Sequence, residues 1–163
     1  MSSAPLRTVP DLAFLLTRAG HVLTTELTAA LADLGITPRG QCVLIHALGN
    51  QYTQGQLAEL CALDKTTMVV TLDELERAGL ARRDPSPADR RARIVAVTEA
   101  GQRLVEAGQK IVDRIHRDIL NSLPEVEAEH FVDALVNLTA TRLAEPVPCD
   151  TPPRRRAPRP TGP

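Results

Sequence analysis

The sequence predicts a mainly α-helical fold with one small β-hairpin, in which a helix-turn-helix is followed by the hairpin and joined to longer helices. Three observations support this class. Apolar residues recur at three- and four-residue spacing from about residue 10 to residue 34 and again after residue 98, which is the period of amphipathic helices. Two short helices are expected across a tight turn between residues 53 and 78. Two β-favouring segments flank the run Pro85-Ser86-Pro87-Ala88.

The first predicted helix, residues 10–34, has a longer apolar stripe than a helix at the edge of a small domain needs. Gly35 is expected to end it in the left-handed conformation. A second helix should begin at Thr37-Pro38, because Thr caps helix starts and Pro suits the first turn, and should end at Gly49-Asn50. The long stripe predicts a surface for a partner.

The helix-turn-helix is predicted from its helix-start signals. Thr53 and Gln56 form a T-x-x-Q capping box, and Asp64 is placed to cap a helix from about Lys65 to Ala78, which Gly79 closes. The inward stripe of that helix is Met68, Leu72 and Leu75. Its other faces carry Lys65, Thr66, Thr67, Val70, Thr71 and Glu74. We expect the N-terminal members of this outward set to meet a ligand.

The β-favouring segments, residues 80–84 and about 91–97, predict a hairpin with a basic tip. The intervening prolines lack backbone donors and should not continue the ladder. Arginines gather here and are opposed only by Asp84 and Asp89; they are Arg82, Arg83, Arg90, Arg91 and Arg93. A basic hairpin directly after a helix-turn-helix favours double-stranded DNA as the partner, although a solvated hairpin without a ligand is the alternative.

Composition restricts the function classes further. The net charge is −1 over 163 residues, but acidic residues concentrate between Glu99 and Glu145, which leaves a basic edge on an acidic body. Only 2% of residues are aromatic, which argues against a surface that stacks single-stranded bases. No phosphate-binding loop, nucleophile elbow, metalloprotease or dinucleotide motif is present, so we expect neither an enzyme nor a cofactor. Without a signal peptide or an apolar run of about 20 residues, the expected location is cytoplasmic, with no membrane partner.

The order of elements and one block of residues resemble the MarR (multiple antibiotic resistance regulator) family of bacterial transcription regulators. The resemblance covers about residues 10–143, and its most specific parts are Asp64-Lys65-Thr66-Thr67, Gly79-Leu80, Asp89-Arg90-Arg91 and Val97-Thr98-Glu99-Ala100-Gly101. It implies a homodimer with winged helix-turn-helix lobes that binds an inverted-repeat operator. It also implies a small-molecule effector held between the DNA lobe and the dimer helices, where His21, Val22, His46 and Ile111 are candidates for the lining. The regulator could be a repressor, which we expect, or an activator.

The resemblance and the residue chemistry together predict the DNA contacts. By resemblance, Arg91 enters the minor groove, Asp89 orients its guanidinium, and Arg90 assists at the hairpin tip. Many family members carry an Arg where this chain has Val70, which predicts an operator that leans towards A·T pairs. The full predicted set is Lys65, Thr66, Thr67, Val70, Thr71, Arg83, Asp89, Arg90, Arg91 and Arg93.

The chain divides by these criteria into a DNA-binding lobe at residues 37–97 and dimerisation helices at residues 10–34 and 98–145. Residues 1–9 are expected to be flexible and the Pro/Arg-rich tail 146–163 disordered. The arginines of this tail could attract phosphates or could be inert. A protein-interaction module that has lost DNA binding remains an alternative, because fold alone does not determine function.

Three cysteines, Cys42, Cys61 and Cys149, form no regular frame, so a reducing compartment is expected. Cys42 and His46 lie four residues apart on one helix face, but metal binding would need ligands from elsewhere, such as His21, His116 or His130. A partly buried pair is the commoner role, and core packing is the expected role of Cys61. We therefore predict no metal site, and a metal- or redox-responsive regulator stays as an alternative.

Overall fold

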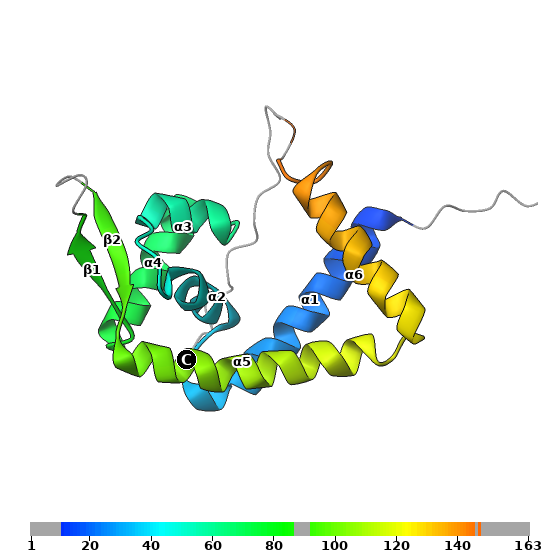
Figure 1. The fold of residues 1–163 in the computed structure, drawn as a ribbon, viewed down its shortest axis with the longest axis horizontal. Helices are drawn as coiled ribbons and strands as arrows, with labels where there is room; N and C mark the ends of the chain where they lie inside the picture. Colours follow the sequence, from blue (N-terminus) through cyan, green and yellow to red (C-terminus); the bar gives the residue numbers. More distant parts are fainter. Residues whose placement is uncertain (1–10, 87–91, 146, 148–163) are drawn as a thin grey trace, which may run out of the picture. The chain divides into compact units, whose positions relative to one another are not determined.

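The computed structural model describes residues 11–86, 92–145 and 147. Its elements are α1 (Leu12–Leu31), the short 3-10 helix η1 (Ala32–Leu34), α2 (Pro38–Ala47), α3 (Gln54–Leu60), α4 (Lys65–Arg77), β1 (Ala81–Pro85), β2 (Arg93–Val97), α5 (Glu99–Leu120) and α6 (Glu125–Ala140) (Figure 1). The strands form one antiparallel hairpin, so the predicted fold class is confirmed. The chain divides into two units, Met1–Asp118 and Ile119–Pro163.

The helix starts follow from local capping chemistry, as predicted. The Thr37 hydroxyl accepts a hydrogen bond from the Gly40 amide at 3.1 Å, and the Asp64 carboxylate accepts one from the Thr67 amide at 2.8 Å. Both halves of the Thr53 capping box are present. These bonds satisfy amides that have no partner inside their helix, so they fix where each helix begins.

The observed ends of the helices and strands agree with the prediction at the glycines and differ from it at two other places. Gly35 has a φ of 67°, the left-handed conformation predicted for it, and Gly79, which was predicted to close its helix, has a φ of 70°. The first helix is shorter than predicted, because its last turn tightens into η1. The hairpin ladder also continues past Pro85, where the Ser86 amide donates to the Ala92 carbonyl at 3.0 Å. Only alternate amides face the partner strand, so the missing donor of Pro85 points away from β2.

The core lies between α2, α3, α4 and the hairpin, which we call together the winged lobe. Met68, Leu72 and Leu75 point inward as predicted, and Met68 and Leu72 have no exposed surface. A segment that was not predicted extends the sheet: Thr53 forms a bridge with Ile94, next to a hydrogen bond between Val95 and Tyr52. This bridge fastens the start of α3 to the wing.

The start of α5 packs closely on the winged lobe. The Thr98 amide donates to the Leu80 carbonyl at 3.0 Å, and the Thr98 hydroxyl caps α5 by accepting from the Gly101 amide at 3.0 Å. A Cβ at Gly101 would collide with the Leu80 carbonyl oxygen. Further along α5, the buried Gln41 amide donates to the Val105 carbonyl at 3.0 Å. The lobe and the first turns of α5 therefore form one packed body.

The long terminal helices differ from the lobe. In α1 only Leu31 is buried, and α6 has no buried residue. The apolar side chains of α6 are uncovered in the single chain, where Val126 is 62% and Phe131 48% exposed. None of the helices among the described residues is both long enough and apolar enough to cross a bilayer.

Candidate DNA interface

The start of α4 is held by Asp64. Its two carboxylate oxygens accept from the Thr67 amide at 2.8 Å and from the Thr67 hydroxyl at 2.7 Å. The Thr67 hydroxyl proton is therefore used in the cap, which leaves its oxygen lone pairs and its methyl group for any ligand. This geometry fixes the rotamer of Thr67 and with it the direction of the first turn.

The outward face of α4 is formed by four neighbouring residues. Lys65 and Thr66 are exposed, and Val69 and Val70 are 40% and 49% exposed. Val69 was missed by the sequence analysis, although its position four residues after Lys65 puts both on one face. Two valines in water are otherwise unfavourable, and methyl groups of this kind suit contact with the methyl of thymine.

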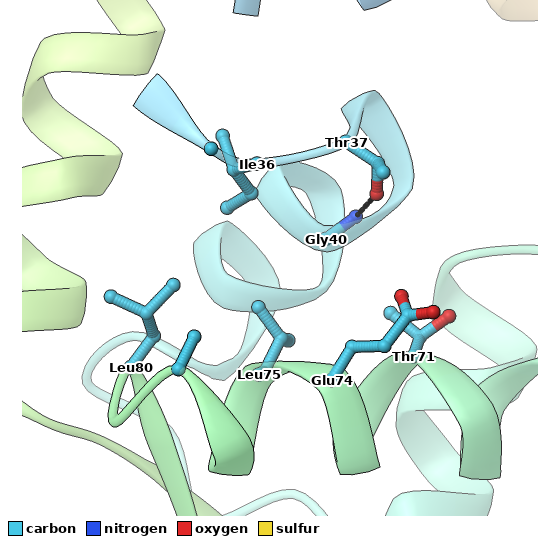
Figure 2. Close-up of a pocket in the computed structure, with 9 residues that line it drawn as sticks. Ile36, Thr37, Gly40, Thr71, Glu74, Leu75 and Leu80 are labelled. Atoms are coloured by element: carbon cyan, nitrogen blue, oxygen red, sulfur yellow. Dashed lines mark hydrogen bonds between the residues drawn. The ribbon is translucent and has the colours of Figure 1, made fainter. Parts of the chain in front are cut away.

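Thr71 does not belong to this face, and the prediction that it contacts DNA is corrected. Its side chain is 2% exposed, and its hydroxyl donates to the Thr67 carbonyl at 2.8 Å. Figure 2 shows Thr71, Glu74 and Leu75 on the side of α4 that faces Thr37 and Gly40 at the start of α2. The space between them is about 60 Å³, large enough for water alone.

Charge divides α4 into two halves. Lys65 lies in the first turn, where the unpaired amides also give a helix its positive end. Asp73, Glu74 and Glu76 follow in the later turns. Asp73 and Glu76 form ion pairs with Arg83, however, and Arg77 adds a positive charge in the last turn. The first turn, which combines Lys65 with the positive helix end, is therefore the part of α4 that most favours a phosphate group.

Arg83 joins two elements of the lobe, and its prediction as a DNA contact is corrected. Its guanidinium forms ion pairs with Asp73 at 2.8 Å and with Glu76 at 2.6 Å, and the side chain is 22% exposed. Both carboxylates lie on α4, whereas Arg83 lies on β1. With its charge neutralised twice, Arg83 has little attraction left for phosphate, but it fastens the hairpin to α4.

The remaining described arginines of the hairpin are available to a ligand. Arg93 is exposed at the end of β2, opposite Pro85. Arg82, which was not predicted as a site residue, has a side chain that is 63% exposed and pairs with Asp84 at 2.8 Å. The predicted tip residues Asp89, Arg90 and Arg91 lie outside the described residues.

A cavity of about 360 Å³ lies between α1, α2 and α5. Its lining is mostly apolar with a few polar groups, the character of a small-molecule site. Of the residues predicted to line such a site, only His46 does so; Ile111 packs against the core, and His21 and Val22 are exposed. The full lining is Leu27, Pro38, Gln41, Cys42, Ile45, His46, Gln109, Val112 and His116.

Comparison with known proteins identifies the family. Residues 34–92 match a family model described as the MarR family. A MarR-family transcriptional regulator from Rhodococcus sp. RHA1 is 30% identical in sequence, and its structure aligns with a TM-score of 0.71 over 80% of this chain and 93% of that chain. The chain belongs to the MarR family.

Two structures of one MarR-family relative extend this finding. CouR from Rhodococcus jostii RHA1 bound to p-coumaroyl-CoA is 30% identical, with a TM-score of 0.72 over 86% of this chain and 96% of that chain. The transcriptional repressor CouR bound to a 23-mer DNA duplex is 29% identical, with a TM-score of 0.68 over 81% and 92%. The family consists of transcriptional regulators, so the predictions of a DNA-binding regulator and of a non-enzyme are confirmed.

Proposed function

We propose that this MarR-family protein is a homodimeric repressor that binds an inverted-repeat operator and releases it when an amphipathic small molecule fills the cavity beside α2. The observation that carries the proposal is the exposed start of α4, with its lysine and two valines, fastened by Arg83 to a basic hairpin. A duplex would meet the helix and the hairpin as one rigid body.

In the proposed complex, the first two turns of α4 enter the major groove, which is wide enough for a helix. Lys65 contacts phosphate, and the Thr66 hydroxyl meets a base edge or a phosphate. Val69 and Val70 meet thymine methyls. Because no arginine on this face reads guanine, half-sites rich in A·T pairs are preferred.

The hairpin reads the adjacent minor groove. Arg91 enters the groove, where a narrow A·T-rich segment concentrates negative potential, and Asp89 and Arg90 support it at the tip. Arg93, exposed at the end of β2, contacts the backbone. In this proposal, α4 recognises thymine methyl groups in the major groove, and the hairpin recognises the width of the minor groove.

A second copy of the chain is the proposed partner of the uncovered apolar residues. They belong to α1 and α6, the elements that bury least within one chain. A two-fold dimer would present two recognition helices to half-sites about 34–36 Å apart, which requires an inverted repeat. The exposed residues are Leu12, Phe14, Leu15, Leu16 and Val22 on α1 and Val126, Phe131, Val132, Val136 and Leu138 on α6.

The cavity between α1, α2 and α5 is the proposed effector site. Its volume of about 360 Å³ and apolar lining suit an aromatic or acyl group, and His46, His116 and Gln109 could fix a polar substituent. A ligand that binds better to a conformation in which the two winged lobes mismatch the half-sites would lower operator affinity by population shift. The structure of CouR with p-coumaroyl-CoA supports testing aromatic acids and their thioesters first.

Selection of preferred sites from random duplex DNA, followed by binding measurements over a salt series, tests the DNA proposal. We expect an A·T-leaning inverted repeat, with affinity that falls steeply as salt rises. Arg91→Ala should weaken all sites by about 10-fold, whereas Thr66→Ala should change which sites are preferred. GC-rich half-sites, a single half-site or no binding in dilute buffer would each refute the proposal.

A fluorescence anisotropy assay on the selected operator tests the effector. Aromatic acids and their CoA thioesters should release the labelled duplex from the unaltered protein. Val112→Trp fills the cavity and should abolish release while leaving operator affinity within about threefold. If every compound that releases DNA does so equally from Val112→Trp, the effector binds elsewhere.

A further inference from the structure

Three potential metal-ligand atoms meet between α2 and the C-terminal end of α3. The sulfurs of Cys42 and Cys61 and a ring nitrogen of His46 all lie within 4.8 Å of one another. Cys42 and His46 are one turn apart on α2, and Cys61 caps the C-terminal end of α3. The sequence analysis sought the third ligand among distant histidines and assigned Cys61 to the core, because the contact between α2 and the α3 end is tertiary.

The spacing of these atoms suits a tetrahedral ion. With Zn–S bonds of about 2.3 Å and Zn–N bonds of about 2.0 Å, ligand atoms around zinc are about 3.7 Å apart. The three atoms would move inward by at most about 1 Å, which small χ rotations supply. All three residues are half-buried, so an ion could reach them and still be partly shielded from water.

The protonation chemistry agrees with this geometry. The pKa of Cys42 is lowered to about 6, first because the Cys61 thiol hydrogen-bonds to it and then because of the His46 imidazole, while burial opposes the shift. The same hydrogen bond raises the pKa of Cys61 above its ordinary value. Both sulfurs are free of disulfide bonds and so remain available as ligands.

Two cavities border the cluster and give it access to solvent. Cys42 lines the cavity of about 360 Å³ together with His46 and His116. It also lines a second cavity of about 480 Å³, which Cys61 and Leu63 border on the side of the helix-turn-helix turn. Sites with three protein ligands hold zinc with a water or another small ligand in the fourth position.

We propose that Cys42, His46 and Cys61 bind one Zn²⁺ ion per chain, with the fourth position open to water in the adjoining cavity. This revises the expectation of no metal site, and it does not depend on the proposed operator. Cys42 and His46 also border the proposed effector cavity, so the ion would occupy part of its wall.

The ion would connect α2 to the turn that leads into α4. Cys61 precedes Asp64, the cap of α4, by three residues, and Ala62 between them has a φ of 50°. A left-handed residue other than glycine is costly by about 1 kcal/mol, so the turn depends on the contacts around it. Zinc would add a covalent-strength tether at that place and would stabilise the native state by mass action.

Cobalt titration of the full-length, metal-free protein under a non-thiol reductant tests the site. We expect one Co²⁺ per chain, a thiolate-to-cobalt charge-transfer band in the near ultraviolet and the intense visible bands of a tetrahedral site, all removed by one equivalent of Zn²⁺. Cys149→Ser, which alters the cysteine in the tail, is the matched control and should behave as the unaltered chain. Cys42→Ser and Cys61→Ser should each lose most of the charge-transfer intensity, and His46→Ala should bind at least tenfold more weakly.

Thermal unfolding supplies a second readout that does not require the variants to bind cobalt. Zn²⁺ should raise the melting temperature of the unaltered chain and of Cys149→Ser, and should leave that of Cys61→Ser unchanged; circular dichroism checks that each variant is folded. Cobalt bands that survive in Cys61→Ser but vanish in Cys149→Ser or His116→Ala would overturn the assignment, as would the absence of bands in the reduced chain. Operator binding by the metal-free protein, measured in parallel, keeps failure of the site distinct from failure of the proposed DNA function.

Discussion

The winged lobe and the terminal helices use their apolar residues differently. The lobe buries its apolar residues within one chain, from Val43 on α2 to Val95 on β2. In contrast, α1 buries only Leu31 and α6 buries nothing, although both are rich in leucine and valine. The same kind of helical periodicity therefore has two outcomes. In the lobe the apolar face is buried by packing within the chain, and in the terminal helices it stays exposed in the single chain.

The largest expected effect is in the lobe, at Gly101. A methyl group there would collide with the Leu80 carbonyl and would lie 2.8 Å from Val97 Cγ1, neither of which moves without shifting the hairpin. We expect Gly101→Ala to lower the free energy of unfolding by about 3 kcal/mol in urea denaturation. Gly55→Ala is the matched control, since its methyl would meet only Thr53 Oγ1 at 3.9 Å. Equal stability of the two variants would show that the lobe is packed more loosely than described.

The next largest effect is on self-association through α6, and it should leave the packing of the winged lobe unchanged. Val136 is 61% exposed in the single chain, so Val136→Glu leaves intrachain packing nearly unchanged. Burying that carboxylate against a second copy should weaken self-association at least 100-fold, about 2.7 kcal/mol, as measured by analytical ultracentrifugation. The neighbouring Asn137→Glu adds the same charge to a position that is already polar and should change association little. An unaltered dimer in Val136→Glu would remove α6 from the interface.

Inside the lobe, substitutions of two neighbouring arginines should differ clearly in their effect on stability. Arg83→Ala removes the cation between Asp73 and Glu76 and should destabilise the chain by about 1–2 kcal/mol. Arg82 has a 63% exposed side chain in a single surface pair, so Arg82→Ala should change stability by less than about 0.5 kcal/mol. Urea denaturation compares the two. The reverse order would contradict the role of Arg83 as the clamp between β1 and α4.

The smallest effect tests the cap of α4. Asp64→Ala removes the acceptor of the Thr67 amide and should lower stability by about 1 kcal/mol. Asp64→Asn keeps an acceptor and should stay within about 0.5 kcal/mol of the unaltered chain. Hydrogen exchange at the Thr67 amide is the local measurement, and faster exchange is expected only in the alanine variant. Equal exchange in both variants would mean that the cap does not hold the helix start.

The features that the sequence predicted well depend on residues close together in the chain. Each of the helix caps at Thr37, Thr53, Asp64 and Thr98 is closed by a group three residues further on, so residue type and spacing suffice. The left-handed glycines follow from backbone sterics alone. Much of the fold was therefore readable without knowledge of tertiary contacts.

What the sequence did not predict depends on partners far along the chain. Arg83 meets carboxylates seven and ten residues away, and Cys61 meets Cys42 across nineteen positions. Thr71 was placed on an outward face by helix periodicity, but α2 covers that side. Periodicity gives the face of a helix and not the neighbour that covers it, so these three assignments required the assembled structure.

Because one guanidinium joins β1 to α4, the offset between the element proposed for the major groove and that proposed for the minor groove is built into each subunit. In the proposed dimer, the separation between the two winged lobes would be set by contacts between the two copies and not by this ion pair. We therefore expect an extra base pair within a half-site to be rejected more strongly than one inserted at the operator centre. Natural binding sites should then differ in the length of the central spacer, while the length of each half-site stays constant.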